Sequence, residues 1–400
     1  MAFFLNRKNT QEKKLGIYVH IPFCRSKCEY CDFYSLGGAR DPRLTDDYLQ
    51  ALADHIKEAG RLAPDYVVDT VYFGGGTPSF FGAENLDKIL DEIQSSFRMG
   101  ENPEITLEAN PDSVSDVALK RLLRVGFNRI SLGVQSDDDV ILQKLGRPHN
   151  FAEAKSAMEA ARKVGFANIS LDLMYGLPNQ TLTGWKETVQ RVVRLRPEHI
   201  SCYALKVEEN TPLWKYQDCA NLPSDDVQAD MYLAACDILR EHGYEHYEIS
   251  NFSKKGFASK HNLKYWTGGE YLGFGPTAAS DFAGKRFTII RDLKGYNEGI
   301  AKKRQILAEC ESIPQRERAG EYIMLRLRTS IGVNAQEYEK QFLLSFEPLQ
   351  RAFESFADKG LAVFENDSWR LTEQGWLLSN RIILRLQEAQ ERSEPLAKKR

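Results

Sequence analysis

Three cysteines with the spacing CxxxCxxC are the residues of this chain with the most specific chemistry: Cys24, Cys28 and Cys31. They follow an apolar run that predicts a β-strand. A 4Fe-4S cluster has more irons than these three thiolates can ligate, and the next cysteine along the chain is Cys202. The spacing therefore predicts a 4Fe-4S cluster with one iron open to a ligand. Zinc or buried free thiols are the alternatives, but zinc motifs usually pair two such knuckles, and no second knuckle follows at a usable spacing.

The length, net charge and cysteine count of the chain indicate its number of domains, its cellular setting and the partners it does not favour. At 400 residues the chain exceeds the roughly 250 to 300 residues of a single hydrophobic core, so we expect a large and a smaller domain. A formal net charge of -3 provides no global field for nucleic acid. Seven cysteines, three of them in the motif, favour reduced thiols and a cytoplasmic setting. No stretch has the length of a signal-peptide core or a membrane span, although basic residues near the ends leave peripheral membrane contact open.

Apolar runs alternate with amphipathic helical patterns in the first half of the chain. Their continuous apolar character suits strands that are buried on both faces of a parallel sheet. The alternation predicts an α/β fold, a partial (β/α)6 TIM-like barrel, although a doubly wound sheet would show the same pattern. The predicted strands are 16–23, 67–73, 104–109, 129–134, 168–174 and 199–205, and the predicted helices are 44–61, 83–97, 115–125, 152–164 and 182–195.

Polar and glycine-rich residues stand where these strands end, which favours the barrel. Barrel enzymes collect their active sites at the C-terminal ends of parallel strands. Gly75 and Gly76, inside a triple glycine, would let backbone groups approach a ligand closely, or would simply form a tight turn. Glu108, as a double acceptor, suits a ribose diol, although a salt-bridged carboxylate would look the same.

Three further polar residues stand at or near these strand ends. Gln135 and Arg147 offer donors to a hydroxyl or a carboxylate, and an ordinary contact at the rim is the alternative. Asp172 lies within an apolar strand, where an unpaired charge is expensive, so we expect it to have a partner.

Together, four motifs resemble those of the radical S-adenosylmethionine superfamily: the CxxxCxxC loop, Gly-Gly-Thr-Pro at 75–78, Glu-Ala-Asn-Pro at 108–111 and Gly-Val-Gln-Ser at 133–136. Within it they resemble the branch that holds the oxygen-independent coproporphyrinogen III dehydrogenases and the heme chaperones. The resemblance covers residues 15 to 386. It implies a partial (β/α)6 barrel whose open cluster iron is chelated by the amino and carboxylate groups of S-adenosylmethionine.

The resemblance also implies roles for individual residues. Cys24, Cys28 and Cys31 would hold the cluster, and an electron from the reduced cluster would cleave the cofactor into methionine and a 5′-deoxyadenosyl radical. A second cofactor molecule is left open. The residues implied in cofactor binding are Tyr18, Tyr30, Gly75, Gly76, Thr77, Glu108, Gln135, Arg147, Asp172 and Ala204.

Two features favour the chaperone side of this branch. Phe33 stands where the dehydrogenases carry a further cysteine, in CxxxCxxCxC, and residues 261–266 match the HNxxYW motif of the heme chaperone group. We expect this motif to form a loop packed against the barrel mouth. His261 could ligate heme iron while Tyr265 and Trp266 pack on the porphyrin, or the histidine could cap a loop whose aromatics join the core. Other candidate iron ligands are His20, His149, His242, His246 and the cysteines outside the motif.

The resemblance therefore implies a cytoplasmic protein that binds heme and delivers it to hemoproteins such as respiratory enzymes, without a nucleic-acid partner. A homodimer is left open. The enzymatic alternative is oxidative decarboxylation of coproporphyrinogen III to protoporphyrinogen IX, against which Phe33 and the HNxxYW motif both count.

A second, smaller domain is predicted after residue 304. Helices at 316–328, 334–344, 348–359 and 373–391, with a hairpin of 361–364 and 369–372, predict an α+β, winged-helix-like domain. We interpret it as a lid or interaction domain. The predicted organisation is a tail at 1–14, the barrel at 15–215, a connecting region with the HNxxYW motif at 216–304, the C-terminal domain at 305–391 and a tail at 392–400.

Overall fold

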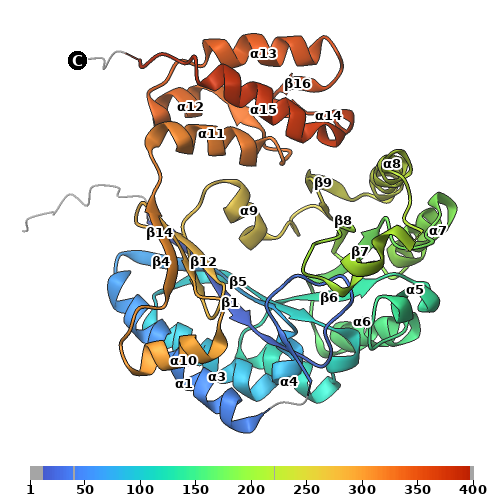
Figure 1. The fold of residues 1–400 in the computed structure, drawn as a ribbon, viewed down its shortest axis with the longest axis vertical. Coiled ribbons are helices and arrows are strands. Elements are labelled where there is room, and N and C mark those ends of the chain that lie inside the picture. The colour runs from blue at the N-terminus through green and yellow to red at the C-terminus, as the bar shows by residue number, and fades with distance from the viewer. Residues whose placement is uncertain (1–11, 39–40, 220, 397–400) are drawn as a thin grey trace, which may run out of the picture.

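A single large sheet forms the core of the protein. The computed structural model describes residues 12–38, 41–219 and 221–396, in which 12 strands share this sheet. Its central strands are parallel neighbours, in chain order (Figure 1). They are β1 (Lys13–Ile21), β4 (Tyr66–Gly75), β5 (Met99–Ala109), β6 (Arg129–Gln135), β7 (Ile169–Tyr175) and β8 (His199–Ala204). All six predicted strands are confirmed.

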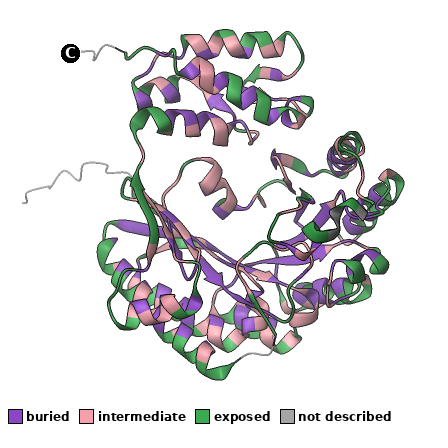
Figure 2. Ribbon diagram, in the orientation of Figure 1, coloured by how far each residue is buried: buried purple, intermediate pink, exposed green. Residues whose placement is uncertain are grey.

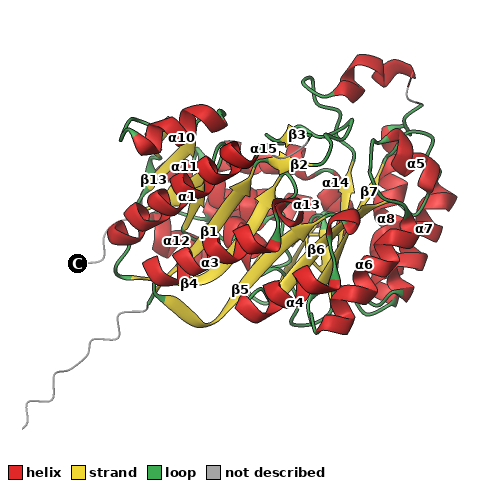
Figure 3. Cartoon of the chain, turned by 90° about the horizontal axis from the view of Figure 1, so that it is seen from below, coloured by secondary structure: helices red, strands yellow, loops and turns green. Residues whose placement is uncertain are grey.

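Helices cover the outer face of these strands, as Figure 3 shows from below. They are α1 (Pro42–Leu62), α3 (Ala83–Ser96), α4 (Asp116–Val125), α6 (Phe151–Val164) and α7 (Leu182–Arg194). Their buried residues recur with helical spacing, so one side of each helix packs on the sheet (Figure 2). Side-chain caps fix where several begin; Asn150 and Glu153, for example, form a capping box at the start of α6.

The sheet does not close into a barrel. Strand β1 pairs with β11 (Tyr271–Phe274) on the side away from β4. Strand β8 pairs with β10 (Asn251–Ser253) on the side away from β7. Strands β1 and β8 are therefore not neighbours, and the partial (β/α)6 barrel is confirmed. Short strands that the sequence did not predict extend the sheet: β9 (Glu245–Glu248) at one edge, and β12 (Ala279–Phe282), β13 (Lys285–Ile289) and β14 (Leu307–Ser312) at the other.

The HNxxYW residues form a helix inside the open barrel. The expectation of a loop is wrong, because α9 (Lys260–Trp266) is capped at its start by the Ser259 hydroxyl, which accepts from the Asn262 N–H. The Glu104 carboxylate on β5 accepts from the backbone N–H groups of Lys260 and His261, each at 3.0 Å. Figure 1 shows α9 between the two halves of the sheet.

The remaining helices of the C-terminal part pack against one another above the barrel (Figure 1). They are α11 (Gln315–Arg326), α12 (Ala335–Phe342), α13 (Glu347–Ala357), α14 (Glu373–Leu377) and α15 (Ser379–Gln390), with a small sheet of β15 (Val333–Asn334), β16 (Ala362–Glu365) and β17 (Ser368–Leu371). The predicted hairpin is confirmed. Its turn, Asn366-Asp367, has φ of 50° and 60°, as a two-residue hairpin turn requires.

The last predicted helix is two helices. The break falls at Leu378, between α14 and α15. Trp376 accounts for the break, because it attaches α14 to the end of α11. Its indole N–H donates to the Leu327 carbonyl there, at 2.8 Å. Because the C-terminal part combines these helices with the small sheet of β15, β16 and β17, its predicted α+β character is confirmed.

Shorter elements complete the chain. They are β2 (Phe23–Cys24), β3 (Leu36–Gly37), α2 (Pro78–Phe81), η1 (Pro111–Ser113), α5 (Asp139–Lys144), η2 (Pro212–Cys219), α8 (Asp225–Glu241) and α10 (Leu293–Ala301). Among the described residues, no helix combines the length and apolar character that crossing a membrane requires. Of the two predicted tails, residues 1–11 and 397–400 lie outside the described residues, while Lys13 and Lys14 belong to β1. The predicted domain boundaries stay predictions.

Candidate functional site

The C-terminal ends of the parallel strands surround a cavity of about 570 Å³, which we call the mouth cavity. It brings together every residue that the sequence predicted for cluster and cofactor binding except Tyr18. Those lining it are Cys24, Cys28, Tyr30, Cys31, Gly75, Gly76, Thr77, Glu108, Gln135, Arg147, Asp172 and Ala204.

The cysteine loop forms one wall of the mouth cavity. The Thr77 hydroxyl donates to Cys24 Sγ at 3.4 Å, and the Arg147 guanidinium donates to Cys28 Sγ at 3.5 Å. Burial raises the pKa of the Cys31 thiol to about 11, and it raises the pKa of Cys24 as well. Such thiols keep their protons at neutral pH unless a metal displaces them. Three sulfur donors from one loop, each facing the same cavity, fit an iron-sulfur cluster.

Gly75 and Gly76 lie where a side chain would not fit. A Cβ on Gly76 would stand 2.8 Å from the Phe23 carbonyl oxygen and 3.0 Å from Cys24 Sγ. Gly75 has a φ of 110°, and a Cβ there would stand 2.7 Å from the His20 ring. The glycines therefore serve both the tight turn and the close approach of backbone to the cysteine loop.

Glu108 presents a carboxylate to the mouth cavity from the end of β5. The Tyr72 hydroxyl donates to Oε1 at 2.8 Å, and the Gly75 N–H donates to Oε2 at 3.3 Å. Burial raises the pKa of Glu108 to about 7, and the nearby Asp172 adds to this shift. The side chain is therefore poised to accept hydrogen bonds from a ligand that replaces the missing solvent.

Tyr18 lies one layer behind this wall. Its ring stacks on Tyr72 with 6.2 Å between centroids, and its hydroxyl is 3.2 Å from His20 Nδ1. Tyr18 thus supports Tyr72, which contacts Glu108, and it does not line the mouth cavity.

Asp172 has the partners that its apolar strand led us to expect. The Ser131 hydroxyl lies 3.0 Å from both carboxylate oxygens, and the Ser170 hydroxyl lies 3.2 Å from one of them. Burial nevertheless raises the pKa of Asp172 above its usual range. Hydroxyl groups satisfy the carboxylate without neutralising it, so a ligand with a donor or a positive charge would be favoured here.

Arg147 is more fully engaged than the sequence indicated. Its guanidinium donates to Asn110 Oδ1 at 2.8 Å and to the Gly133 carbonyl at 2.6 Å, in addition to Cys28. It therefore ties the cysteine loop to the ends of β5 and β6. Gln135, at the end of β6, has a φ of 67°, a backbone conformation that is costly for a residue other than glycine and that often marks a functional site.

Sequence reasoning missed Tyr72 and Asn110 as parts of this wall. Asn110 stands inside the Glu-Ala-Asn-Pro stretch, so its position at a strand end was a usable signal. Tyr72 gave no such signal, because a tyrosine inside an apolar strand looks like any other core residue.

His261 lies fully buried in the barrel interior, and both its ring nitrogens have partners. Nδ1 is 2.9 Å from the Thr70 hydroxyl, and Nε2 is 2.8 Å from the Tyr265 hydroxyl. Burial, followed by the charges of Lys264 and Arg129, lowers the pKa of His261 to about 3, so the imidazole is neutral. Its ring stacks on Tyr72 at 5.2 Å. In this arrangement His261 offers no free nitrogen to an iron ion.

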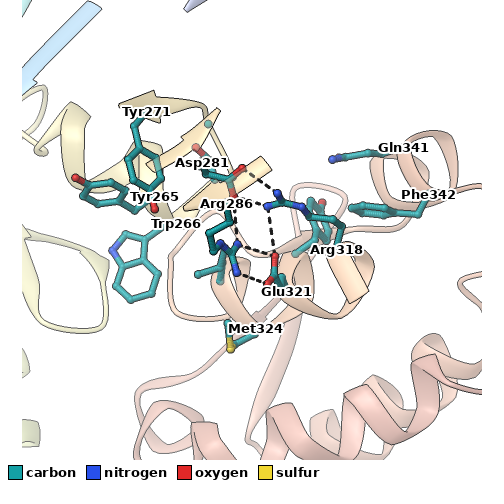
Figure 4. A pocket seen from close by; sticks show the side chains of 15 residues that line it. Tyr265, Trp266, Tyr271, Asp281, Arg286, Arg318, Glu321, Met324, Gln341 and Phe342 are labelled. Carbon is teal, nitrogen blue, oxygen red and sulfur yellow. Dashed lines mark hydrogen bonds and ion pairs between the residues drawn. The ribbon is translucent and has the colours of Figure 1, made fainter. Parts of the chain in front are cut away.

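Tyr265 and Trp266 line a different cavity, of about 320 Å³, which we call the aromatic pocket (Figure 4). It lies between α9, the β12–β13 ribbon and α11. Four charged side chains pair across it: Arg286 donates to Glu321 Oε1 at 2.6 Å, and Arg318 Nη2 donates to Asp281 Oδ1 at 2.9 Å. The structure therefore separates the predicted heme residues from the predicted cofactor residues.

Comparison with known proteins agrees with this architecture. Residues 18–192 match the Radical SAM superfamily, and residues 313–378 match the HemN C-terminal domain. The heme chaperone HemW of Haemophilus influenzae is 38% identical over 379 residues, covering 92% of this chain and 97% of that protein. HemW of Bacillus subtilis is 36% identical over 374 residues, with the same coverage.

A solved structure shares the fold over nearly the whole chain. Coproporphyrinogen III oxidase (HemN) from Escherichia coli matches with a TM-score of 0.82 at 23% sequence identity, covering 94% of this chain and 90% of that one. This match shows the common architecture, while the HemW relatives are more similar in sequence and are matched over 97% of their own length. The chain belongs to the HemW family of the radical SAM superfamily.

Proposed function

We propose that this protein is a heme chaperone: it binds a 4Fe-4S cluster with S-adenosylmethionine in the mouth cavity, binds heme, and delivers the heme to hemoproteins such as respiratory enzymes. The observation that carries the proposal is the match to proteins named heme chaperones over 92% of this chain. The unpaired cysteines among the described residues are consistent with a cytoplasmic setting.

The mouth cavity supports the cluster and cofactor part of the proposal. Cys24, Cys28 and Cys31 would hold the cluster, which when bound supplies the electron for reductive cleavage of the cofactor. Gly75 and Gly76 offer backbone groups beside the cysteine loop, and the Glu108 and Asp172 carboxylates face the same space. The chain itself orients the ligand and supplies acceptors at these positions.

The dehydrogenase alternative has less support. Phe33, at the position where the dehydrogenases carry a further cysteine, lines the mouth cavity with 68% of its surface exposed. Its ring makes that part of the rim apolar and gives it no thiol. The relatives named HemW are also more similar in sequence than the solved HemN structure.

Acceptor proteins are the further partners that this role requires. Acceptor hemoproteins follow from the chaperone role, and the net charge of -3 gives no support for nucleic-acid binding. A homodimer and peripheral membrane contact are compatible with this role, and sizing of the heme-loaded protein with and without lipid vesicles would test both.

Heme transfer from the anaerobically reconstituted protein tests the function. The protein is loaded with hemin, mixed with the apo form of a b-type cytochrome, separated from it by size, and both fractions are assayed for heme. We expect transfer to the cytochrome, and no conversion of coproporphyrinogen III by the same preparation after reduction and addition of S-adenosylmethionine. Catalytic formation of protoporphyrinogen IX would overturn the proposal in favour of the dehydrogenase.

A further inference from the structure

The histidines of this chain differ in whether a ring nitrogen is free to bind iron. His20, His199 and His261 each have partners at both ring nitrogens. His149 keeps one nitrogen without a partner, but that atom is buried. In His246, Nε2 faces the Ile249 carbonyl, and Nδ1 faces Cys236 and Glu373.

Two histidines remain that are at least partly exposed and have one ring nitrogen without a hydrogen-bond partner among the described residues, and one of them lines a cavity. His242 is exposed at the end of α8. His55, in the middle of α1, lines a groove of about 940 Å³, which we call the outer groove. Ligand sites of drug-sized molecules usually have volumes of about 300 to 1,000 Å³.

The outer groove is a slot on the side of the barrel, away from the mouth cavity. It lies between α1, the ribbon of β11 to β14 and the turn between α10 and β14, which Figure 1 shows as neighbours. Apolar side chains dominate its walls: Phe274, Phe282, Phe287, Ile300 and Ile306. Leu62 at its edge is 72% exposed. Flat apolar ligands gain most from a slot of this kind.

His55 is arranged as a metal-binding imidazole would be. Its Nδ1 is 3.0 Å from the Tyr296 hydroxyl, and its ring packs edge-on against Phe274 at 4.9 Å. No hydrogen bond engages Nε2 within the described part of the chain. Burial lowers the pKa of His55 to about 4, which keeps the ring neutral. A partner at one ring nitrogen is what orients the other nitrogen toward a metal in known sites.

Charges around the outer groove are mostly positive. Its acidic members are Asp54 and Glu58, against five basic side chains. Lys57 pairs with Glu92 at 3.1 Å, while the other four have no ion pair among the described residues. Unpaired cations beside an apolar slot suit a ligand with an apolar body and carboxylate arms. These four are Arg61, Lys285, Lys303 and Arg304.

We propose that the outer groove is the heme site of this protein, with His55 Nε2 as an axial ligand and the propionates at the basic rim. The inference rests on the proposed function, because the chaperone role supplies the ligand. Binding forms one iron–nitrogen bond, displaces a water or a second weak ligand from the iron, and moves no electron. The HNxxYW helix then has a structural role, and the heme is held outside the barrel, where an acceptor protein can reach it.

Hemin titration of the reconstituted full-length protein tests this assignment, with resonance Raman spectra to identify the axial ligand. We expect a histidine-ligated signal in the wild type. His55→Ala should weaken hemin binding roughly tenfold or more, and added imidazole should restore both the affinity and the signal, which a merely structural defect would not show. Cys310→Ser should leave both unchanged, which separates His55 from the exposed thiol on β14.

Charge-reversal variants test the rim independently of His55. Lys303→Glu with Arg304→Glu should weaken the binding of hemin but not of hemin dimethyl ester, which lacks the carboxylates. The matched control is Lys186→Glu with Lys255→Glu, two exposed lysines outside the described cavities.

The outcomes separate the inference from the proposed function. Absence of hemin binding by the wild type would contradict the chaperone proposal itself. Normal hemin binding by both the His55 and the rim variants, with loss in a Tyr265→Ala and Trp266→Ala double variant, would overturn the outer groove and assign heme to the aromatic pocket.

Discussion

The mouth cavity and the α9 helix use the same kinds of residue in opposite ways. In the mouth cavity, Glu108, Cys24 and Cys31 border empty space, and the pKa of each is raised because little solvent reaches it. In α9, His261 is fully buried, lines none of the three described cavities, and has a protein partner at each ring nitrogen. A polar residue that borders a cavity therefore indicates a ligand site, whereas one that is enclosed by its protein partners indicates a structural role.

The two regions meet at Tyr72. Its ring stacks on His261, and its hydroxyl donates to Glu108. The α9 helix therefore supports the wall of the mouth cavity without lining that cavity itself. Substitutions in the two regions should separate ligand binding from stability.

Loss of a cluster cysteine should have the largest effect. Cys28→Ser removes one of the three sulfur donors, so we expect the reconstituted protein to lose the 4Fe-4S signal. Iron and sulfide analysis with electron paramagnetic resonance of the reduced protein measures this. Cys310→Ser, on an exposed edge strand, is the matched control and should keep a full cluster. A normal cluster in the Cys28 variant would refute the assignment of the loop.

His261→Ala should destabilise the fold by about 2 to 5 kcal/mol, because it leaves a cavity and removes the partners of the Thr70 and Tyr265 hydroxyls. Urea unfolding of the cluster-free protein measures the change. His242→Ala, at an exposed helix end, should change stability by only about 0.5 kcal/mol. If His261→Ala left stability intact and abolished heme binding, α9 would be a ligand site and the comparison would fail.

Glu108→Gln should have opposite effects on binding and on stability. We expect weaker S-adenosylmethionine binding, by about 1 to 3 kcal/mol, because a charged acceptor is lost. The same change should stabilise the cofactor-free protein at pH 8, since it removes a buried charge without removing volume. Calorimetric titration and urea unfolding measure the two effects. Unchanged cofactor affinity would exclude Glu108 from the binding site.

The two regions should also give stability slopes of opposite sign with pH. Glu108 titrates near 4.5 when unfolded and at about 7 when folded, so the folded state holds more protons between these values and stability falls as pH rises. His261 titrates near 6.5 when unfolded and at about 3 when folded, so stability falls as pH drops below 6.5. Comparing urea unfolding of the wild type and Glu108→Gln from pH 5 to 8 isolates the first slope. An identical slope in both proteins would show that folding does not raise the pKa of Glu108.

Tyr72→Phe should give the smallest effect. It removes one hydrogen bond to Glu108 and keeps the stack on His261. We expect S-adenosylmethionine binding to weaken by about 0.5 to 1.5 kcal/mol, with a similar or smaller loss of stability. An effect as large as that of Glu108→Gln would mean that Tyr72 itself contacts the ligand.

The sequence was a good guide to the barrel because its strands are apolar on both faces. That pattern, with polar residues at each strand end, was enough to bring Cys28, Glu108 and Asp172 to one cavity. Boundaries shifted mainly at strand starts, as in β5, which begins at Met99 with exposed residues that have no apolar pattern.

Other parts could not be predicted from local patterns. Strands β9 to β13 are short and depend on pairing with distant strands, and α9 is held by Glu104 from far earlier in the chain. His55 was not singled out, because a histidine within an amphipathic helix looks ordinary until the opposite wall of its groove is known. Where a site is formed by segments that are distant in the sequence, the residues next to each one along the chain do not indicate that it lines the site.

An open iron in the mouth cavity is the central feature of the proposed cofactor site, and spectroscopy of the reduced cluster tests whether it exists. Electron paramagnetic and double resonance spectra are recorded before and after addition of S-adenosylmethionine labelled with ¹⁵N at its amino group and ¹³C at its carboxylate. We predict a changed cluster signal with couplings to both labels, and weaker changes in Glu108→Gln at the same cofactor concentration. An intact cluster whose spectrum does not respond to saturating cofactor would contradict the assignment of the mouth cavity as the S-adenosylmethionine site.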